Sequence, residues 1–198
     1  MVLNPSTNTI SATITTGMPA FPVGIALNSN GASLQNGKIV ISGNVGVAIF
    51  DPSINAITTT TANPSTAISG GRSIRYISSL DQYVISNSGN NNIIVLSIAT
   101  ATTFAVANTI SSALGVQDVV VDESANYIIT TIATTTSGQV AFQIYDMTTK
   151  YSLFTMPTSV NSTGSAAGRI HLDSLNKRAF IVGRSVAVNN VGLIYYNS

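Results

Sequence analysis

The residues of this sequence that could do chemistry gather at the starts of three predicted β-strands. These segments contain Arg72 and Arg75, then Asp118, then Arg169 with His171. Guanidinium groups bind carboxylates and phosphates through paired hydrogen bonds, and an imidazole can exchange a proton near neutral pH. The functional interpretation is a site for an anionic or polar ligand. The structural interpretation is that Asp118 pairs with an arginine and locks neighbouring strands together, because buried charges are generally paired.

The remaining residues offer little for catalysis. The chain has no cysteine, which excludes disulfides, thiol catalysis and thiolate metal sites. Its seven acidic residues fall mostly in predicted turns at places that do not correspond between segments. The sequence contains neither a Gly-x-Ser-x-Gly elbow nor a phosphate-binding glycine motif. We therefore expect no enzyme activity, no catalytic residue, no metal site and no cofactor.

The polar part of the sequence is mostly neutral. Charged residues make up 8% of the chain, against roughly 25% in typical soluble domains, and Ser, Thr and Asn take their place. The net charge is +1 and the basic residues form no stripe, so we expect no nucleic-acid partner. No apolar run approaches the roughly 20 residues that span a bilayer, so we expect no membrane insertion. This composition is typical of virion, appendage and secreted adhesive modules.

The elements that must position the chemical residues are strands of a repeated unit. The segment 47–60 echoes 1–14, weaker copies follow at 92–108 and 139–155, and a half-copy lies at 191–197. A fixed period of roughly 45–50 residues is the signature of a propeller or a solenoid. Short runs of alternating apolar residues, bounded by Gly, Asn, Pro and Ser, predict four β-strands in each unit.

These units predict one all-β domain over residues 1–198, a small β-propeller of four four-stranded blades. The blades are expected at approximately 22–61, 71–108, 116–156, and 167–198 plus 9–16. The segment Thr9–Thr15 matches the outer strand of the other units, so we expect it to complete the last blade by pairing with Val191–Asn197. Such closure would remove the open edges of the sheets.

The segment IFDPSINAI at 49–57, and the pairing of 22–28 with 37–42, resemble the YVTN/NHL-type β-propeller repeat. The resemblance implies that the first strand of each blade lines a central channel, near whose mouth the five chemical residues would lie. Some propeller lactonases hold a divalent cation with several channel-facing acids, and here only Asp118 is placed for that role. Such propellers more often have six or seven blades. The chain could be a four-bladed ring, half of a ring shared by two chains, or a piece of a longer protein.

Two functions are therefore expected from the sequence. The first is a non-enzymatic structural or adhesive module, extracellular or on the surface of a virion, an appendage or a cell. Its partners would be other structural proteins of a larger assembly, further copies of itself, and glycans. The alternative is a ligand-binding or hydrolytic propeller that uses the polar site at the channel mouth.

Overall fold

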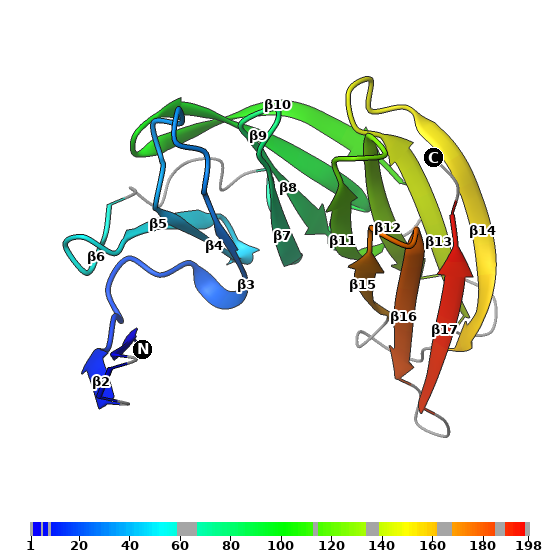
Figure 1. The fold of residues 1–198 in the computed structure, drawn as a ribbon, viewed down its shortest axis with the longest axis horizontal. Coiled ribbons are helices and arrows are strands. Elements are labelled where there is room, and N and C mark those ends of the chain that lie inside the picture. The colour runs from blue at the N-terminus through cyan, green and yellow to red at the C-terminus, as the bar shows by residue number, and fades with distance from the viewer. Residues whose placement is uncertain are drawn as a thin grey trace.

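The chain folds into strands and turns arranged as the blades of a β-propeller (Figure 1). The computed structural model describes residues 2–4, 6–7, 9–58, 67–112, 115–133, 139–161, 168–184 and 189–196. Over these residues the secondary structure contains no helix, and hence no helix able to cross a membrane. The predicted fold class, an all-β propeller of four blades, is confirmed.

Each blade is an antiparallel meander in which every strand pairs with the next one along the chain. Blade 1 contains β3 (Ala20–Leu27), β4 (Ile39–Val45), β5 (Val47–Asp51) and β6 (Ala56–Ile57). Blade 2 contains β7 (Gly71–Ile77), β8 (Gln82–Asn87), β9 (Asn92–Thr100) and β10 (Thr103–Ser111). Blade 3 contains β11 (Val116–Asp122), β12 (Tyr127–Ala133), β13 (Gln139–Asp146) and β14 (Ser152–Asn161). Blade 4 has three described strands, β15 (Arg169–Asp173), β16 (Arg178–Arg184) and β17 (Asn189–Tyr195).

Among the residues that the structure describes, the core consists of three clusters of buried apolar side chains, one between each pair of neighbouring blades. Between blades 1 and 2, for example, Val47 and Ile49 of β5 belong to the same cluster as Ile74 of β7. Blades 2 and 3 have a neighbour on each side, so both faces of their sheets are covered. Continuous apolar runs such as Ile93–Leu96 follow from this arrangement, because a strand buried on both faces cannot alternate with polar residues.

The predicted closure by the N-terminal strand is wrong in this structure. Thr9–Ala12 forms β2, which pairs with β1 (Val2–Asn4) in a separate two-stranded sheet. Among the described residues, β17 pairs with β16 alone. Figure 1 shows β2 beside blade 1 and β17 at the opposite end of an arc of blades. The likeness of Thr9–Thr15 to an outer strand identifies the kind of strand and not its partner. Pairing with the nearby β1 closes a much shorter loop, at a lower entropic cost, than closing the arc.

Candidate functional site

The inner strands of the first three blades share one irregularity near their starts. A bulge interrupts the register between Pro22 and Gly24 in β3, between Gly71 and Ser73 in β7, and between Val116 and Asp118 in β11. Directly after the bulge, Gly24, Ser73 and Asp118 pair with Ser42, Ser86 and Thr131, so the three occupy equivalent positions. Bulges re-aim side chains, and here they do so at the place where adjacent inner strands contact one another.

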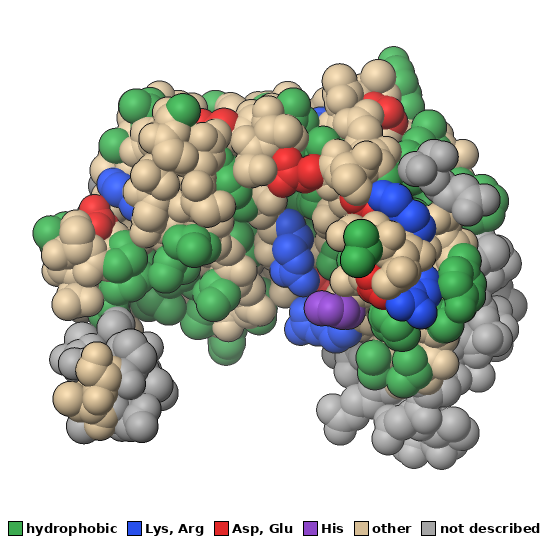
Figure 2. Space-filling model, viewed as in Figure 1, with side chains coloured by type: hydrophobic (Ala, Val, Ile, Leu, Met, Phe, Trp, Pro, Cys, Tyr) green, Lys and Arg blue, Asp and Glu red, His purple; other side chains and the backbone are tan. Residues whose placement is uncertain are grey.

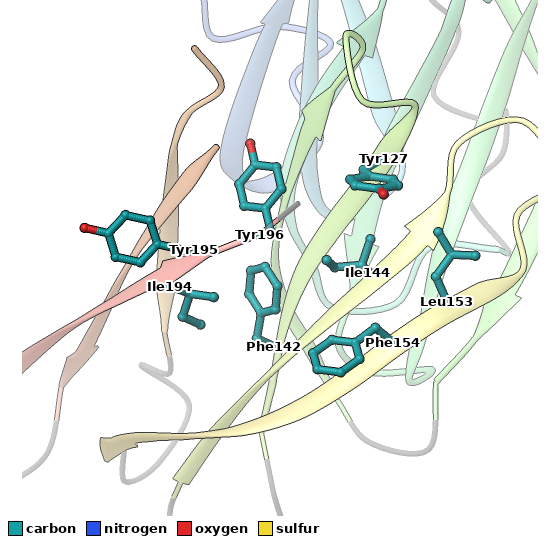
Figure 3. Close-up of a pocket in the computed structure, with 8 residues that line it drawn as sticks. All are labelled: Tyr127, Phe142, Ile144, Leu153, Phe154, Ile194, Tyr195 and Tyr196. Atoms are coloured by element: carbon teal, nitrogen blue, oxygen red, sulfur yellow. The ribbon is translucent and has the colours of Figure 1, made fainter. Parts of the chain in front are cut away.

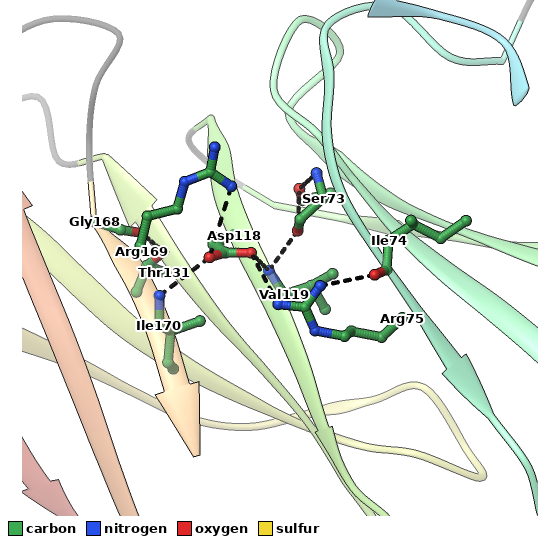
Figure 4. Close-up of polar contacts among 10 residues, drawn as sticks. Ser73, Ile74, Arg75, Asp118, Val119, Thr131, Gly168, Arg169 and Ile170 are labelled. Atoms are coloured by element: carbon green, nitrogen blue, oxygen red, sulfur yellow. Dashed lines mark hydrogen bonds and ion pairs between the residues drawn. The ribbon is translucent and has the colours of Figure 1, made fainter. Parts of the chain in front are cut away.

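Asp118 uses this position to hold the next blade. Its side chain is buried, and its Oδ2 accepts a hydrogen bond of 3.1 Å from the backbone N–H of Ile170 in blade 4. Its Oδ1 accepts one of 2.9 Å from the N–H of Val119. Figure 4 shows the guanidinium groups of Arg75 and Arg169 on two sides of this carboxylate, at 4.0 and 3.9 Å. The carboxylate therefore joins blades 2, 3 and 4.

Ser73 makes the corresponding contact one blade earlier. Its hydroxyl accepts a hydrogen bond of 3.0 Å from the N–H of Val119 and lies 2.9 Å from the hydroxyl of Ser86. At the equivalent position in blade 1, a Cβ added to Gly24 would lie 3.1 Å from the backbone nitrogen of Ile74. The position after the bulge is thus a repeated point of contact between blades, and among the three bulged strands only blade 3 has a charged residue there, Asp118.

The arginines of the site keep part of their surface in solvent. The side chain of Arg169 is 62% exposed and that of Arg75 is 40% exposed. Arg75 also donates a hydrogen bond to the carbonyl of Ile74, and Arg72 donates one to the hydroxyl of Ser88. Burial lowers the pKa of the Arg72 guanidinium, and the positive charge of Arg169 lowers it further. Three arginines, Arg72, Arg75 and Arg169, face one carboxylate, that of Asp118, so the net charge of this rim is positive.

The structure brings four of the five predicted residues into one electrostatic cluster. Arg75 and Arg169 each form an ion pair with Asp118. The positive charge of Arg169 lowers the pKa of Arg72, so these two guanidinium groups interact electrostatically. His171 is exposed on β15, two residues after Arg169, and it takes part in no ion pair with Asp118. Figure 2 shows blue and purple side chains gathered where the arc is hollow, on a face that is otherwise mostly tan and green. The described residues contain no group of three or more acidic or histidine side chains that could hold a metal ion.

The sequence did not reveal a second polar cluster, which lies between the turns of blades 3 and 4. Asp122 is buried, and its Oδ2 accepts hydrogen bonds from Lys177 at 3.0 Å and from the Tyr196 hydroxyl at 2.8 Å. A related contact joins blades 2 and 3, where Glu123 accepts the N–H groups of Ser78 and Ser79. The only sequence signal was that these residues fall in equivalent turns.

An apolar pocket of about 300 Å³ lies between the outer parts of blades 3 and 4. Figure 3 shows side chains from β13, β14 and the end of β17 around it. Its aromatic and aliphatic lining consists of Tyr127, Phe142, Ile144, Leu153, Phe154, Ile194, Tyr195 and Tyr196. The pocket lies beside β17, on the side of blade 4 where the other blades carry a fourth strand.

Solved structures with the same fold are found at low sequence identity. A functionally unknown protein from Desulfotomaculum acetoxidans DSM 771 is 16% identical, with a TM-score of 0.66 over 90% of this chain and 56% of that chain. A chain of the nidogen/laminin complex is 11% identical, with a TM-score of 0.60 over 82% and 56%. The Dos1 propeller is 11% identical, with a TM-score of 0.57 over 89% and 48%.

These similarities establish the β-propeller fold and nothing finer. The chain spans about half the length of the chains that it matches. No protein-family model matches the sequence, and no curated protein matches it either. Membership of the YVTN/NHL repeat type therefore stays a prediction.

Proposed function

We propose that this protein is a non-enzymatic interaction module that binds a carboxylate group of a partner at the arginine-lined rim of its propeller. One observation carries the proposal. Arg75 and Arg169 approach Asp118 only to 4.0 and 3.9 Å, and both keep much of their side chains in solvent. Each guanidinium therefore has donors directed toward solvent, and a planar carboxylate matches the geometry of that fork.

The same geometry argues against acid–base chemistry at this site. The carboxylate of Asp118 is buried and accepts two backbone N–H groups while two arginines flank it. A general base needs an oxygen within hydrogen-bond reach of the substrate proton. The hydrogen bonds and ion pairs described for Asp118 go to other residues than His171, so the two do not form an acid–base dyad. The composition also predicts that the protein is displayed on a virion, an appendage or a cell surface, and this location stays a prediction.

Citrate is a suitable probe for this site because it presents several carboxylates. We expect NMR titration with citrate to shift the backbone amides of β7, β11 and β15, which contain Arg75, Asp118 and Arg169. A charge-assisted hydrogen bond contributes about 1.5–3 kcal/mol, and about 1.4 kcal/mol corresponds to a tenfold change in affinity. Arg169→Ala should therefore weaken citrate binding by at least about tenfold without changing the fold.

Arg178→Ala is the matched control. Arg178 belongs to the same blade, but it pairs with Asp173 at 2.6 Å where β15 ends and β16 begins. This variant should bind citrate as the wild type does. Equal affinity of the wild type and Arg169→Ala, or no shift in the wild type at all, would refute the proposed site.

A further inference from the structure

The first blade exposes an apolar face at positions that are buried in every other blade. Ile25 lies in the inner strand of blade 1, where it pairs with the second strand, β4. The register of the other blades makes it equivalent to Ile74, Val119 and Ile170, which pair with β8, β12 and β16. Those three residues are at most 4% exposed, because each packs against the preceding blade, whereas Ile25 is 69% exposed. We call this side of a blade its leading face, and on blade 1 it includes Ile25 and the exposed Leu27.

The last blade exposes the opposite face in the same way. The trailing face of a blade is the side that meets the following blade, and on blade 4 it includes the exposed Val182, Val191 and Leu193. The pairing of β17 with β16 makes Val191 equivalent to Val47, Ile93 and Phe142, and Leu193 equivalent to Ile49, Val95 and Ile144. All six equivalents are at most 7% exposed, but Val191 is 66% exposed and Leu193 is 46% exposed.

Within the chain, a trailing face packs against the leading face of the next blade at three interfaces, and the two exposed faces correspond to the two sides of such an interface. Ile74 clusters with Val47 and Ile49, and the same combination of leading and trailing residues recurs in the clusters around Val119 and Ile170. The leading face of blade 1 therefore fits the trailing face of blade 4 in kind and in register. Figure 1 places the two blades at opposite ends of the arc, so one copy does not join them.

We infer that a second copy of this chain covers both faces, in a two-fold symmetric ring of eight blades. In this ring blade 1 of each copy packs on blade 4 of the other, so Ile25 meets Val191 and Leu193 of the second copy. The contact is head to tail, and such contacts close when the rotation per subunit divides a circle. Three solved structures with the same fold are matched over 56%, 56% and 48% of their own length, so each of those chains is longer than this one.

The apolar pocket between blades 3 and 4 supports the same occupant. In blade 2 the fourth strand places Phe104 in the cluster formed with the trailing face of blade 1. Blade 4 has no described fourth strand, and the equivalent place is the pocket lined by Phe142, Ile144 and Leu153. Along the chain, the fourth strand of one blade is followed by the inner strand of the next blade, as β10 is followed by β11 and β14 by β15. A second copy seated by blade 1 on blade 4 thus brings its own β2 toward β17.

This exchange requires β1 to give way to β17 of the second copy. The β1–β2 pairing is short: it joins three residues of β1 and contains a register shift. Strand β17 offers seven residues with an edge that has no described partner strand. All four residues of β2 can pair along β17, whereas β1 offers three, and the added strand also covers the open edge of β17, so β17 is the better neighbour for β2.

The mass of the chain in solution tests the inference. Analytical ultracentrifugation of the purified wild type should give twice the monomer mass of 20.5 kDa across a wide concentration range. Ile25→Lys alters the leading face and Leu193→Asp the trailing face, and each variant alone should sediment as a monomer. An equal mixture of the two should recover the dimer, because the introduced ammonium of one variant then meets the introduced carboxylate of the other and the second interface is unaltered.

Leu175→Asp is the matched control, because Leu175 is exposed in the turn between β15 and β16 and lies outside both faces. It should stay dimeric. A wild-type monomer at all concentrations would overturn the inference, and so would an open polymer. A dimer that survives either single substitution would overturn this interface in favour of a leading–leading or trailing–trailing contact. Far-UV circular dichroism of each variant confirms that a lost dimer is not a lost fold.

Discussion

Asp122 shows how a single side chain holds two blades together. It is buried in blade 3 and accepts hydrogen bonds from Lys177 and Tyr196 of blade 4. Asp122→Asn should lower the free energy of unfolding by about 1–3 kcal/mol, because the partly exposed ammonium of Lys177 and the buried hydroxyl of Tyr196 lose a charged acceptor. Urea unfolding followed by circular dichroism measures this loss.

The control for this substitution lies at the equivalent position of blade 4. Asp173 pairs with Arg178 inside its own blade and is partly exposed, so Asp173→Asn should lower the free energy of unfolding by clearly less than Asp122→Asn does. Equal losses for the two variants would mean that the contact between blades adds nothing at Asp122.

The same carboxylate predicts a dependence of stability on pH. Burial raises the pKa of Asp122, but hydrogen bonds from Ser124, Tyr196 and Lys177 outweigh burial and hold it below the ordinary aspartate value. A carboxyl whose pKa is depressed by folding contributes stability above its unfolded pKa of about 3.9, and this stability is lost as the pH falls through the folded pKa. Urea midpoints measured downward from about neutral pH should fall less steeply for Asp122→Asn than for the wild type. Parallel curves would assign the acid sensitivity to other carboxylates.

At the scale of the elements, close approach between inner strands limits which side chains they can carry. A Cβ on Gly71, in β7, would lie 2.4 Å from the carbonyl oxygen of Gly43 in blade 1. Because that atom belongs to the backbone, Gly71→Ala must push two strands apart. We expect a loss of about 1–3 kcal/mol in the free energy of unfolding.

Gly31 provides the comparison for this strand contact. A Cβ there would meet nothing within 4 Å, and the residue lies in the turn region between β3 and β4. Gly31→Ala should change the free energy of unfolding by less than about 0.5 kcal/mol. A neutral Gly71→Ala would show that blades 1 and 2 can separate without cost, contrary to the shared core between them.

The elements were predictable from the sequence where the information is local. Alternating apolar residues and Asn- or Asp-containing turns predicted the four strands of blades 1 to 3 and the first three strands of blade 4, and their register placed Asp118 among arginines. The contact of Asp122 with Lys177 and Tyr196 was not predictable, since 55 and 74 residues separate the partners. It depends on the packing angle between blades, which no residue pattern states. The predicted pairing of β2 with β17 was wrong for the same reason.

At the scale of the molecule, the two ends of the arc are unlike the rest. Inside the arc, apolar side chains such as Ile74 and Ile93 are covered by a neighbouring blade, whereas Ile25 and Val191 at the ends are not. Monomeric proteins rarely leave large contiguous apolar surfaces in water. In the ring inferred above, pairing the ends of two copies covers both surfaces.

Deletions at the N-terminus distinguish two contributions to the dimer, the packing of the two faces and the exchange of strand β2. Removal of residues 1–16 deletes β2 (Thr9–Ala12) and leaves the leading face of blade 1 intact. If β2 adds to β17 of the second copy, the dissociation constant of the dimer should rise by at least about tenfold, which corresponds to about 1.4 kcal/mol. Removal of residues 1–8 alone should leave the dimer at least as stable as the wild type, since it deletes only β1, which competes with β17 for β2. Sedimentation at a series of concentrations measures both constants. Equal constants for the wild type and the longer deletion would show that the faces associate without strand exchange and that β2 does not fill the pocket beside β17.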